Sequence, residues 1–377
     1  MTRLLLFFSV QWMFQFAALA QSDFCSKLKV PGLIFCDDFE SSQALTTRYF
    51  EHDANNSDFV LREGVGRQGS KGMRALWQTG EVGAGSLLKS IGRTPSTYIG
   101  RNASMPDSTF KEIYWRLDLR HQEGWQGEGP AKLTRALVMA NANWATGAMA
   151  HIWSGGPGNV FLGMDPASGI DASGRLVSTR YNDFPNLRWL GFKPGNIPLF
   201  SDARVGEWFC IEAHMKLNTP GSSDGVLEFW INDSLQAGSY ALNWHGNWNS
   251  DPKNYGINYI SLENYWNSGS PAQQERYFDN FVIATSRIGC KETVISHTHE
   301  ERNEMAIEQY GESLIWQLSD NCSGILRFYD LMGQELHQKK IFGRGSWQPE
   351  GTLPAGLYLY QFQSEDCGQS DGRFRVE

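Results

Sequence analysis

The chain has 377 residues, of which 41% are hydrophobic and 13% aromatic, enough to build the cores of one large domain and one small domain. Its 39 glycines and 14 tryptophans, with few long apolar patterns of helical period, favour an all-β protein with many turns. The formal net charge of -8 argues against nucleic acid or an anionic membrane as a partner, because either would need a basic stripe. A locally basic cleft for an anionic sugar remains compatible with this charge.

Residues 1–20 have the pattern of a secretory signal peptide. Arg3 precedes the apolar run LLLFFSV, and the small residues Ala18-Leu19-Ala20 end the segment. The mature chain is expected to begin near Gln21. A membrane anchor is the alternative, but the run is short for a span and is interrupted by two glutamines. We therefore predict a secreted or cell-surface protein with no membrane span after signal cleavage.

Six cysteines in an exported chain form an even set, which indicates disulfide bonds. No two of them have CxxC spacing and none lies beside a histidine pair, which argues against zinc and against thiol catalysis. Keeping each bond within one proposed domain gives the pairs Cys25–Cys36, Cys210–Cys290 and Cys322–Cys367, although other pairings are possible.

The strand signal LIFC, residues 33–36, is followed by acidic residues that end with Glu40. A second strand signal begins beside Ser70, after a glycine-rich turn. With Asp279, these residues would surround a hard cation with carboxylate, hydroxyl and carbonyl oxygens, the ligands that calcium takes. The alternative is that the acids cap turns or pair with Arg74. Our hypothesis is a structural calcium site at Glu40, Ser70 and Asp279.

Residues Glu112 to Arg120, EIYWRLDLR, alternate apolar and polar side chains, which predicts a strand with one face in the core. The other face carries Tyr114, Arg116 and Arg120, the residue types that bind a uronate carboxylate or a row of hydroxyls. We therefore expect Tyr114 and Arg120 to bind substrate and Arg116 to be catalytic. The alternative is that Arg116 pairs with Asp118 along the strand.

The glycine-rich segment from His121 to Arg135 is predicted to be a long loop that forms one wall of a cleft. The strand signal that follows it, residues 148–154, places His151 and Trp153 on one side. We expect Trp153 to stack on a sugar ring and His151 to be catalytic. The alternative for His151 is a structural histidine whose hydrogen bonds are satisfied.

Residues Trp208 to Asp233 contain the clearest strand alternation in the chain, on both sides of the turn NTPGSSDG. They predict a β-hairpin whose first strand has one apolar face and one polar face exposed to solvent. A hairpin of this kind needs a second sheet about 10 Å away to cover its apolar face. The predicted fold is therefore a two-sheet antiparallel sandwich.

The stretch ISLENYWN, residues 260–267, predicts a strand with Glu263, Tyr265 and Asn267 on one face. Either face of this strand has side chains that stack on sugars or hydrogen-bond to them. We assign Tyr265 to catalysis, and Glu263 and Asn267 to substrate binding.

Two stretches, KLNTPGSSDGVLEFWIND and the later YFDNFVI at residues 277–283, resemble the hairpin and the closing strand of concanavalin A-like jelly rolls related to glucuronan and alginate lyases. The resemblance covers about the last third of the main domain, which we place at residues 21–290. It implies a jelly-roll sandwich, a polysaccharide partner, a histidine on a strand comparable to that of His151, and a calcium ion at the acidic site described above. The alginate lyase signatures RxExR, QIH and YFKAGxYNQ are missing.

Residues 291–311 are polar and lack strand periodicity, so we interpret them as a linker. The segment 312–377 contains YDLMGQEL, then LPAGLYLY, then a short terminal strand, and strongly resembles the type A sorting domain of the type IX secretion system. The resemblance implies a small β-sandwich, export through the periplasm of a Gram-negative bacterium, and the type IX secretion machinery as a partner. The alternative is a small accessory β-sandwich.

These features lead to two main functional hypotheses. One is an eliminative polysaccharide lyase in which Arg116, His151 and Tyr265 meet on one concave surface, neutralise a uronate carboxylate and transfer protons. The other is a lectin-like protein that holds a polysaccharide on tryptophans without catalysis. A hydrolase ranks third, because paired carboxylates on one strand are not evident.

Overall fold

A computed structural model describes residues 24–127, 129, 132–290, 306–310, 313–318, 323–342, 344–347, 353–364 and 368–376. The chain divides into two compact units, Met1–Thr293 and Val294–Glu377, and each is described here by itself. The expected signal peptide and the expected Cys322–Cys367 bond lie outside the described residues. In the described parts, no helix is long and apolar enough to cross a membrane.

The first unit contains two large antiparallel sheets. Sheet A has the strand order β14-β13-β12-β6-β16-β4-β3, and β1 also pairs with β16. Its strands are β1 Leu33–Asp37, β3 Phe59–Arg62, β4 Gly72–Trp77, β6 Glu112–His121, β12 Trp208–Lys216, β13 Gly225–Ile231, β14 Ser234–Leu242 and β16 Gln274–Ala284.

Sheet B has the order β10-β9-β8-β7-β15-β5-β2, and β11 also pairs with β9. Its strands are β2 Glu51–Asp53, β5 Gly83–Ser90, β7 Lys132–Met139, β8 Thr146–Gly155, β9 Phe161–Ser168, β10 Arg188–Trp189, β11 Lys193–Pro194 and β15 Tyr259–Tyr265. The helices of the unit are single turns: α1 Phe24–Lys27, α2 Leu45–Arg48, η1 Asn55–Ser57, η2 Arg67–Gly69, η3 Pro157–Asn159, η4 Phe184–Asn186 and η5 Trp248–Ser250.

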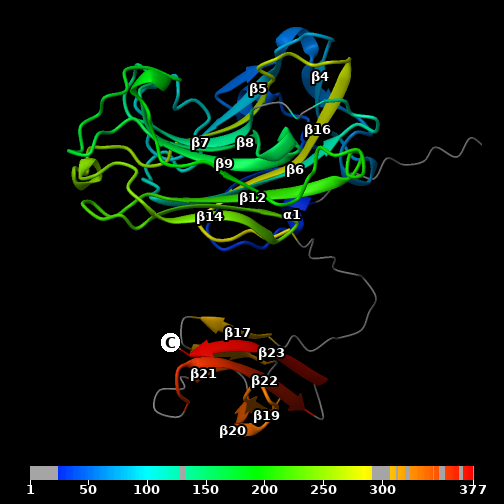
Figure 1. The fold of residues 1–377 in the computed structure, drawn as a ribbon, viewed down its shortest axis with the longest axis vertical. Helices are drawn as coiled ribbons and strands as arrows, with labels where there is room; N and C mark the ends of the chain where they lie inside the picture. Colours follow the sequence, from blue (N-terminus) through cyan, green and yellow to red (C-terminus); the bar gives the residue numbers. More distant parts are fainter. Residues whose placement is uncertain are drawn as a thin grey trace, which may run out of the picture. The chain divides into compact units, whose positions relative to one another are not determined.

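The two sheets lie face to face, as Figure 1 shows with β7, β8 and β9 above β6, β12 and β14. Strands β12 and β13 form the predicted hairpin, with Ala213 opposite Phe229 and Met215 opposite Leu227. All four side chains belong to the buried core between the sheets. The predicted two-sheet antiparallel jelly-roll sandwich is therefore confirmed, and strand alternation is the reason that the sequence indicated it.

The outward side chains of β12 are covered by other parts of the chain, whereas the sequence predicted that this face is exposed to solvent. Glu212 is fully buried. Its carboxylate accepts hydrogen bonds from the backbone N–H groups of Ile288 (2.7 Å) and Gly289 (3.0 Å). The next residue, Cys290, forms a disulfide with Cys210 on the same face of β12. The segment after β16 therefore folds back over sheet A, which alternation within a strand cannot reveal.

Two of the three predicted disulfides lie in described residues, and both are confirmed. They join Cys25 to Cys36 and Cys210 to Cys290. The first attaches the segment around α1 to β1, and the second attaches the end of the unit to β12. Both segments therefore adjoin the outer surface of sheet A.

The second unit is a small all-β structure with its own core. It has a three-stranded sheet in the order β17-β18-β21 and a four-stranded sheet in the order β20-β19-β22-β23 among its described residues. The strands are β17 Ala306–Tyr310, β18 Ser313–Gln317, β19 Ser323–Tyr329, β20 Glu335–Phe342, β21 Arg344–Trp347, β22 Gly356–Ser364 and β23 Gly368–Val376. Residues 306–310 were expected to be linker, but they pair with β18. The linker prediction is therefore wrong for residues 306–310, because a short strand of mostly polar residues gives no clear strand pattern in the sequence.

Candidate functional site

The three residues expected to be catalytic do not share one surface. Arg116 lies on β6 in sheet A, whereas His151 lies on β8 and Tyr265 on β15, both in sheet B. All three side chains point outward from the sandwich, because their strand neighbours, including Trp115 and Ile152, fill the core. Outward directions from opposite sheets diverge, so the expected convergence is wrong.

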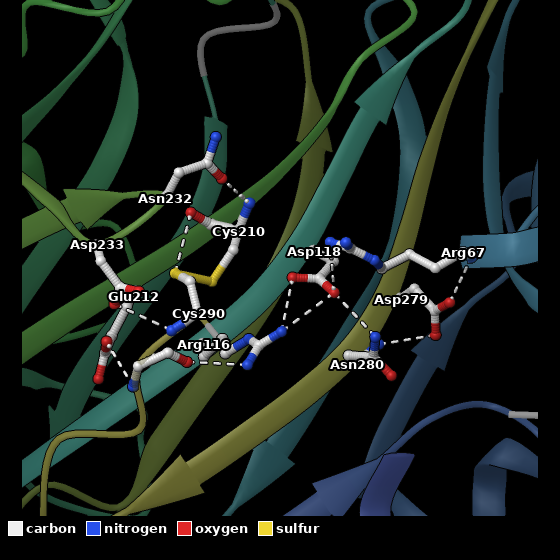
Figure 2. A network of polar contacts seen from close by, with 11 residues as sticks. Arg67, Arg116, Asp118, Cys210, Glu212, Asn232, Asp233, Asp279, Asn280 and Cys290 are labelled. Carbon is white, nitrogen blue, oxygen red and sulfur yellow. Dashed lines mark hydrogen bonds and ion pairs between the residues drawn. A yellow bond between two sulfur atoms is a disulfide. The ribbon is translucent and has the colours of Figure 1, made fainter. Parts of the chain in front are cut away.

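Arg116 is a buried structural residue. Figure 2 shows its guanidinium directed toward Asp118. It is 1% exposed. Its guanidinium donates to both Asp118 oxygens, at 3.2 and 3.3 Å, and to the Gly289 carbonyl at 2.8 Å. The ring of Phe24, in α1, lies 4.8 Å from the guanidinium carbon. Arg116 therefore pairs along the strand, the alternative that the sequence left open, and has no access to a substrate.

The other two residues expected on that strand also lie on the outer face of sheet A. Tyr114 stacks on His214 with ring centroids 4.1 Å apart. The Arg120 guanidinium lies 4.7 Å from the Tyr277 ring and donates to the Val65 carbonyl. Neither residue adjoins His151 or Tyr265, so the predicted substrate-binding set is divided between the two sheets.

On sheet B, three neighbouring strands bring a charged network together. Arg135 on β7 lies directly opposite His151 on β8 and Ser261 on β15 in the sheet register. Its guanidinium donates to the Glu263 carboxylate and, at 3.2 Å, to Nε2 of His151. Arg135 is 0% exposed and His151 is 1% exposed. We call this buried network of Arg135, His151 and Glu263 the charged floor of sheet B.

A loop after β9 covers this floor. Asn182, at a positive φ of 54°, accepts a hydrogen bond from Arg135 at 2.7 Å through Oδ1. The Tyr181 hydroxyl donates to the Glu263 carboxylate at 2.9 Å. The loop is held in shape by the Asp183 carboxylate, which accepts from both the backbone and the hydroxyl of Thr179 at 2.8 Å. A short polar turn thus closes over the charges.

The electrostatics of His151 exclude a simple general-base role. Burial and the charges of Arg135 and Lys132 hold its pKa well below the usual value, so the ring is neutral near pH 7. A guanidinium only donates, so Nε2 of His151 must accept from Arg135 and the ring proton must lie on Nδ1. Among the described residues, Nδ1 has no hydrogen-bond partner. The Nε2 lone pair that a general base would need is therefore occupied by the hydrogen bond from Arg135.

Lys132 and Tyr265 lie at the end of the same face. The Lys132 ammonium is 4.7 Å from the centroid of the Tyr265 ring. Burial, and then the charge of Arg135, lower the Lys132 pKa, while Glu263 acts in the opposite direction. Tyr265 is 41% exposed. This pair combines an accessible phenol with an amine that gives up its proton more readily than a free lysine.

Aromatic side chains lie beside the network. Trp153 on β8 and Trp189 on β10 are stacked, with centroids 5.9 Å apart and an interplanar angle of 18°. Phe184 lies 6.0 Å from Trp189, and Trp153 lies 4.4 Å from the His151 ring. Trp189 is 39% exposed. We call Trp153, Phe184 and Trp189 the aromatic strip.

The structure therefore brings together four of the sequence-predicted residues, namely His151, Trp153, Glu263 and Tyr265. Asn267 is exposed in the turn after β15 rather than on the strand. The prediction from sequence did not include Arg135 and Lys132 in the site, because it placed both residues in a loop. Their strand, KLTRALVM, is buried on both faces, so its alternation is weak and gives little signal.

No family model matches the chain, and no curated protein sequence matches it. Among solved structures, it is similar to alginate lyase Aly36B in complex with alginate tetrasaccharide, at 14% identity over 70% of this chain and 96% of that one, with a TM-score of 0.41. It is also similar to endo-beta-1,4-glucuronan lyase from the fungus Trichoderma reesei, at 12% identity over 67% and 96% of the two chains, with a TM-score of 0.45. Cellulose induced protein Cip1 is 17% identical over 68% and 100%, with a TM-score of 0.36. These likenesses are too distant to assign a substrate or a catalytic residue.

The residues predicted to hold calcium lie around the turn before β4. Oδ2 of Asp279 accepts from Ser70 Oγ at 3.2 Å, and Oε1 of Glu40 accepts from the backbone N–H of Lys71 at 2.8 Å. A Cβ on Gly66 would lie 2.4 Å from Ser70 Oγ, 2.4 Å from the Lys71 carbonyl oxygen and 2.8 Å from Asp279 Oδ2. Three oxygens thus point into one small space.

This oxygen set is of the kind that calcium takes. Among the described residues, no group of three or more His, Cys, Asp and Glu side chains could hold a metal ion. An ion here would therefore depend on the Ser70 hydroxyl and the Lys71 carbonyl together with Asp279. Burial raises the pKa of Asp279 to about 7, and a bound cation would oppose that shift.

Proposed function

We propose that this protein is a carbohydrate-active jelly-roll protein that cleaves a uronate-containing polysaccharide by elimination on the outer face of sheet B. The observation that carries the proposal is the placement of the aromatic strip beside Lys132, Tyr265 and the Arg135–Glu263 pair on one face. Flat rings next to a few polar groups are typical of sites that bind sugars. The Arg135 guanidinium provides positive charge beneath the face that an anionic sugar would contact.

Tyr265, which is exposed, and Lys132, which is partly buried, are assigned to the substrate, and the fully buried residues to its electrostatic background. Lys132, with its lowered pKa, removes the C5 proton of the uronate as a neutral amine. The electron pair of that bond forms the C4=C5 double bond, and the bond from C4 to the leaving oxygen breaks. Tyr265 gives its proton to that oxygen. The buried positive charge of Arg135 stabilises the negative charge that develops on the uronate.

The test is a screen of the purified protein against a panel of uronate polymers. We expect a rise in ultraviolet absorbance from the unsaturated uronate at the new non-reducing end, together with shorter chains. A hydrolase would shorten the chains without the absorbance, and no cleavage of any polymer would reject the enzymatic proposal.

Burial favours one alternative, a lectin-like protein that binds without cleaving. Arg135 and His151 lie beneath Tyr181 and Asn182, so the substrate meets mainly the aromatic strip and Tyr265. In that case affinity electrophoresis would detect polymer binding with no product. The Trp189→Ala variant would reduce the retardation, because it removes one ring of the aromatic strip.

We also propose export to the cell exterior, with the second unit as a sorting domain for the type IX secretion machinery. Two disulfides in the first unit support an oxidising compartment. The second unit has a hydrophobic core of its own among the described residues, which supports its role as a separate sorting domain. Deleting residues 291–377 should leave folded protein in the periplasm. Its appearance in the medium would reject the sorting role.

Calcium at Glu40, Ser70 and Asp279 is a further proposal, with a structural role between β1, β4 and β16. Binding to the folded state alone adds about 2.7 kcal/mol of stability at a hundredfold excess over Kd. Chelation should therefore lower the melting temperature by several degrees. Gly66→Ala, which would fill the space between the oxygens, should remove this response. Gly83→Ala serves as the control, because a Cβ there meets nothing within 4 Å and Gly83 is not among the glycines with a positive φ. An unchanged melting curve in EDTA would remove the ion.

A further inference from the structure

One buried arginine reaches across the core of the sandwich. Arg276 belongs to β16 in sheet A and is 0% exposed. Its guanidinium donates to acceptors in sheet B: the Glu263 carbonyl at 2.7 Å, the Lys132 carbonyl at 3.2 Å and Oδ1 of Asn264 at 2.6 Å. The first two acceptors are the backbone of residues whose side chains lie in the candidate site on the opposite face.

The strands of sheet B are irregular at this place. The pairing of β15 with β7 shifts register between Leu262 and Tyr265, and the pairing of β7 with β8 shifts between Lys132 and Thr134. Register shifts interrupt the ladder and redirect side chains. At this irregularity, Arg276 provides hydrogen bonds from behind to two strand carbonyls. It therefore stabilises the local backbone that sets the directions of Lys132 and Tyr265.

Stability alone is a poor explanation for an arginine here. The ion pairs among the described residues include none for Arg276, and its acceptors are two carbonyls and an amide. Its guanidinium lies against the Trp77 and Phe278 rings, at 5.2 and 5.0 Å. A buried charge without a carboxylate is costly, whereas an apolar side chain of similar volume would fit these surroundings. An apolar side chain, however, could not donate hydrogen bonds to carbonyls of two different strands, as the guanidinium does.

We infer that Arg276 is a positioning residue: it holds the irregular β7–β15 pairing so that Lys132 and Tyr265 face the substrate together. This inference rests on the proposed function. Arg276 does not touch the substrate. It acts through the backbone of Lys132 and Glu263 from the far side of the sheet.

The test compares Arg276→Lys with Arg116→Lys in the full chain. Both positions are buried arginines of sheet A that donate to a backbone carbonyl. Arg276 points into the core toward sheet B, whereas Arg116 points to the outer side of sheet A, away from the site. A lysine keeps the charge and loses the planar fork. We expect kcat on the cleaved uronate polymer to fall about 10- to 100-fold in R276K with little change in KM, and to stay near wild type in R116K.

A second readout does not depend on activity. Acetic anhydride labelling of Lys132 across pH, followed by mass spectrometry of its peptide, reports the ionisation and accessibility of that amine. We expect R276K to move the labelling profile of Lys132 and R116K to leave it unchanged. If R276K does not fold, Asn264→Ala, which removes the Oδ1 acceptor of Arg276, replaces it with the same expected direction.

Equal labelling profiles and equal kcat in the two lysine variants would overturn the positioning role. A wild-type protein that cleaves no uronate polymer, combined with a changed Lys132 profile in R276K, would reject the proposed function and keep the inference. The two failures are therefore distinguishable.

Discussion

The outer faces of the two sheets come from the same strand alternation and differ in what lies on them. On the outer face of sheet A, the part over β6 and β12 is closed by the segment that ends with Cys290 (Figure 2). This segment is bonded to Cys210 and hydrogen-bonded to Glu212. The face of sheet B keeps Trp189 and Tyr265 exposed beside a charged floor. Both outer faces carry an arginine beside a carboxylate. Polar side chains on one face of a strand therefore do not indicate a functional site until the segments that cover that face are known.

The largest effect should follow from breaking the closed face of sheet A. In Arg116→Met, the buried Asp118 keeps Arg67 and Asn280 as its side-chain donors among the described residues. Because the carboxylate loses its closest charge partner on the strand, the free energy of unfolding should fall by about 3 kcal/mol. Urea denaturation measures this loss. Arg175→Met is the control, because its ion pair with Asp171 is exposed and should contribute under about 1 kcal/mol. A loss of cleavage in folded R116M would contradict the assignment of this face to structure.

The next effect concerns the open face of sheet B. Tyr265→Phe removes the proposed proton donor and should lower kcat about 100-fold with the fold intact. Tyr240→Phe is the matched control, since Tyr240 is also exposed but belongs to β14 in sheet A. Steady-state rates on the cleaved polymer decide the matter, and equal rates in the two variants would exclude Tyr265 from proton transfer.

A smaller effect should appear in the pH dependence of stability. Burial raises the pKa of Asp165, which lies opposite His151 in the sheet, to about 6 from an ordinary value of 3.8. The folded state then holds its proton where the unfolded state has lost it, so this group makes stability fall as pH rises from about 4 to about 6. Because Asp165 is only partly buried and solvent screens its charge, we expect about 1 kcal/mol.

Asp165→Asn isolates this contribution from the other titrating groups. The unfolding free energies of wild type and variant, measured between pH 4 and pH 7, should differ by an amount that changes with pH in that window. A constant difference would mean that Asp165 has an ordinary pKa in the folded protein.

The smallest effect concerns the aromatic strip. Trp189→Ala removes the stacking partner of Trp153 and should weaken polymer affinity by about 1 kcal/mol, roughly fivefold. Leu235→Ala, an exposed apolar residue on β14, should leave affinity unchanged. Affinity electrophoresis or isothermal titration provides the measurement. Equal affinity in the two variants would remove the strip from the binding surface.

Much of the fold follows from the sequence by itself. The period-2 patterns of residues 112–120 and 208–233 predicted their strands and inward faces, because every second side chain of a strand must face the same side. The direction of His151 and Trp153 followed in the same way. The even set of cysteines predicted the two disulfides that the described residues contain.

The tertiary structure alone decided which polar residues meet. Alternation gives the side of a strand but not the sheet that the strand joins, so Arg116 and His151 were assigned to one surface although they lie on opposite sheets. Strand β7 gave no clear period because both of its faces are buried, which hid Lys132 and Arg135. The contacts of Arg276 cross the core between strands far apart in sequence, and no local pattern specifies them. A sequence pattern reports the environment of one strand, whereas a site depends on the order of strands and on what covers them.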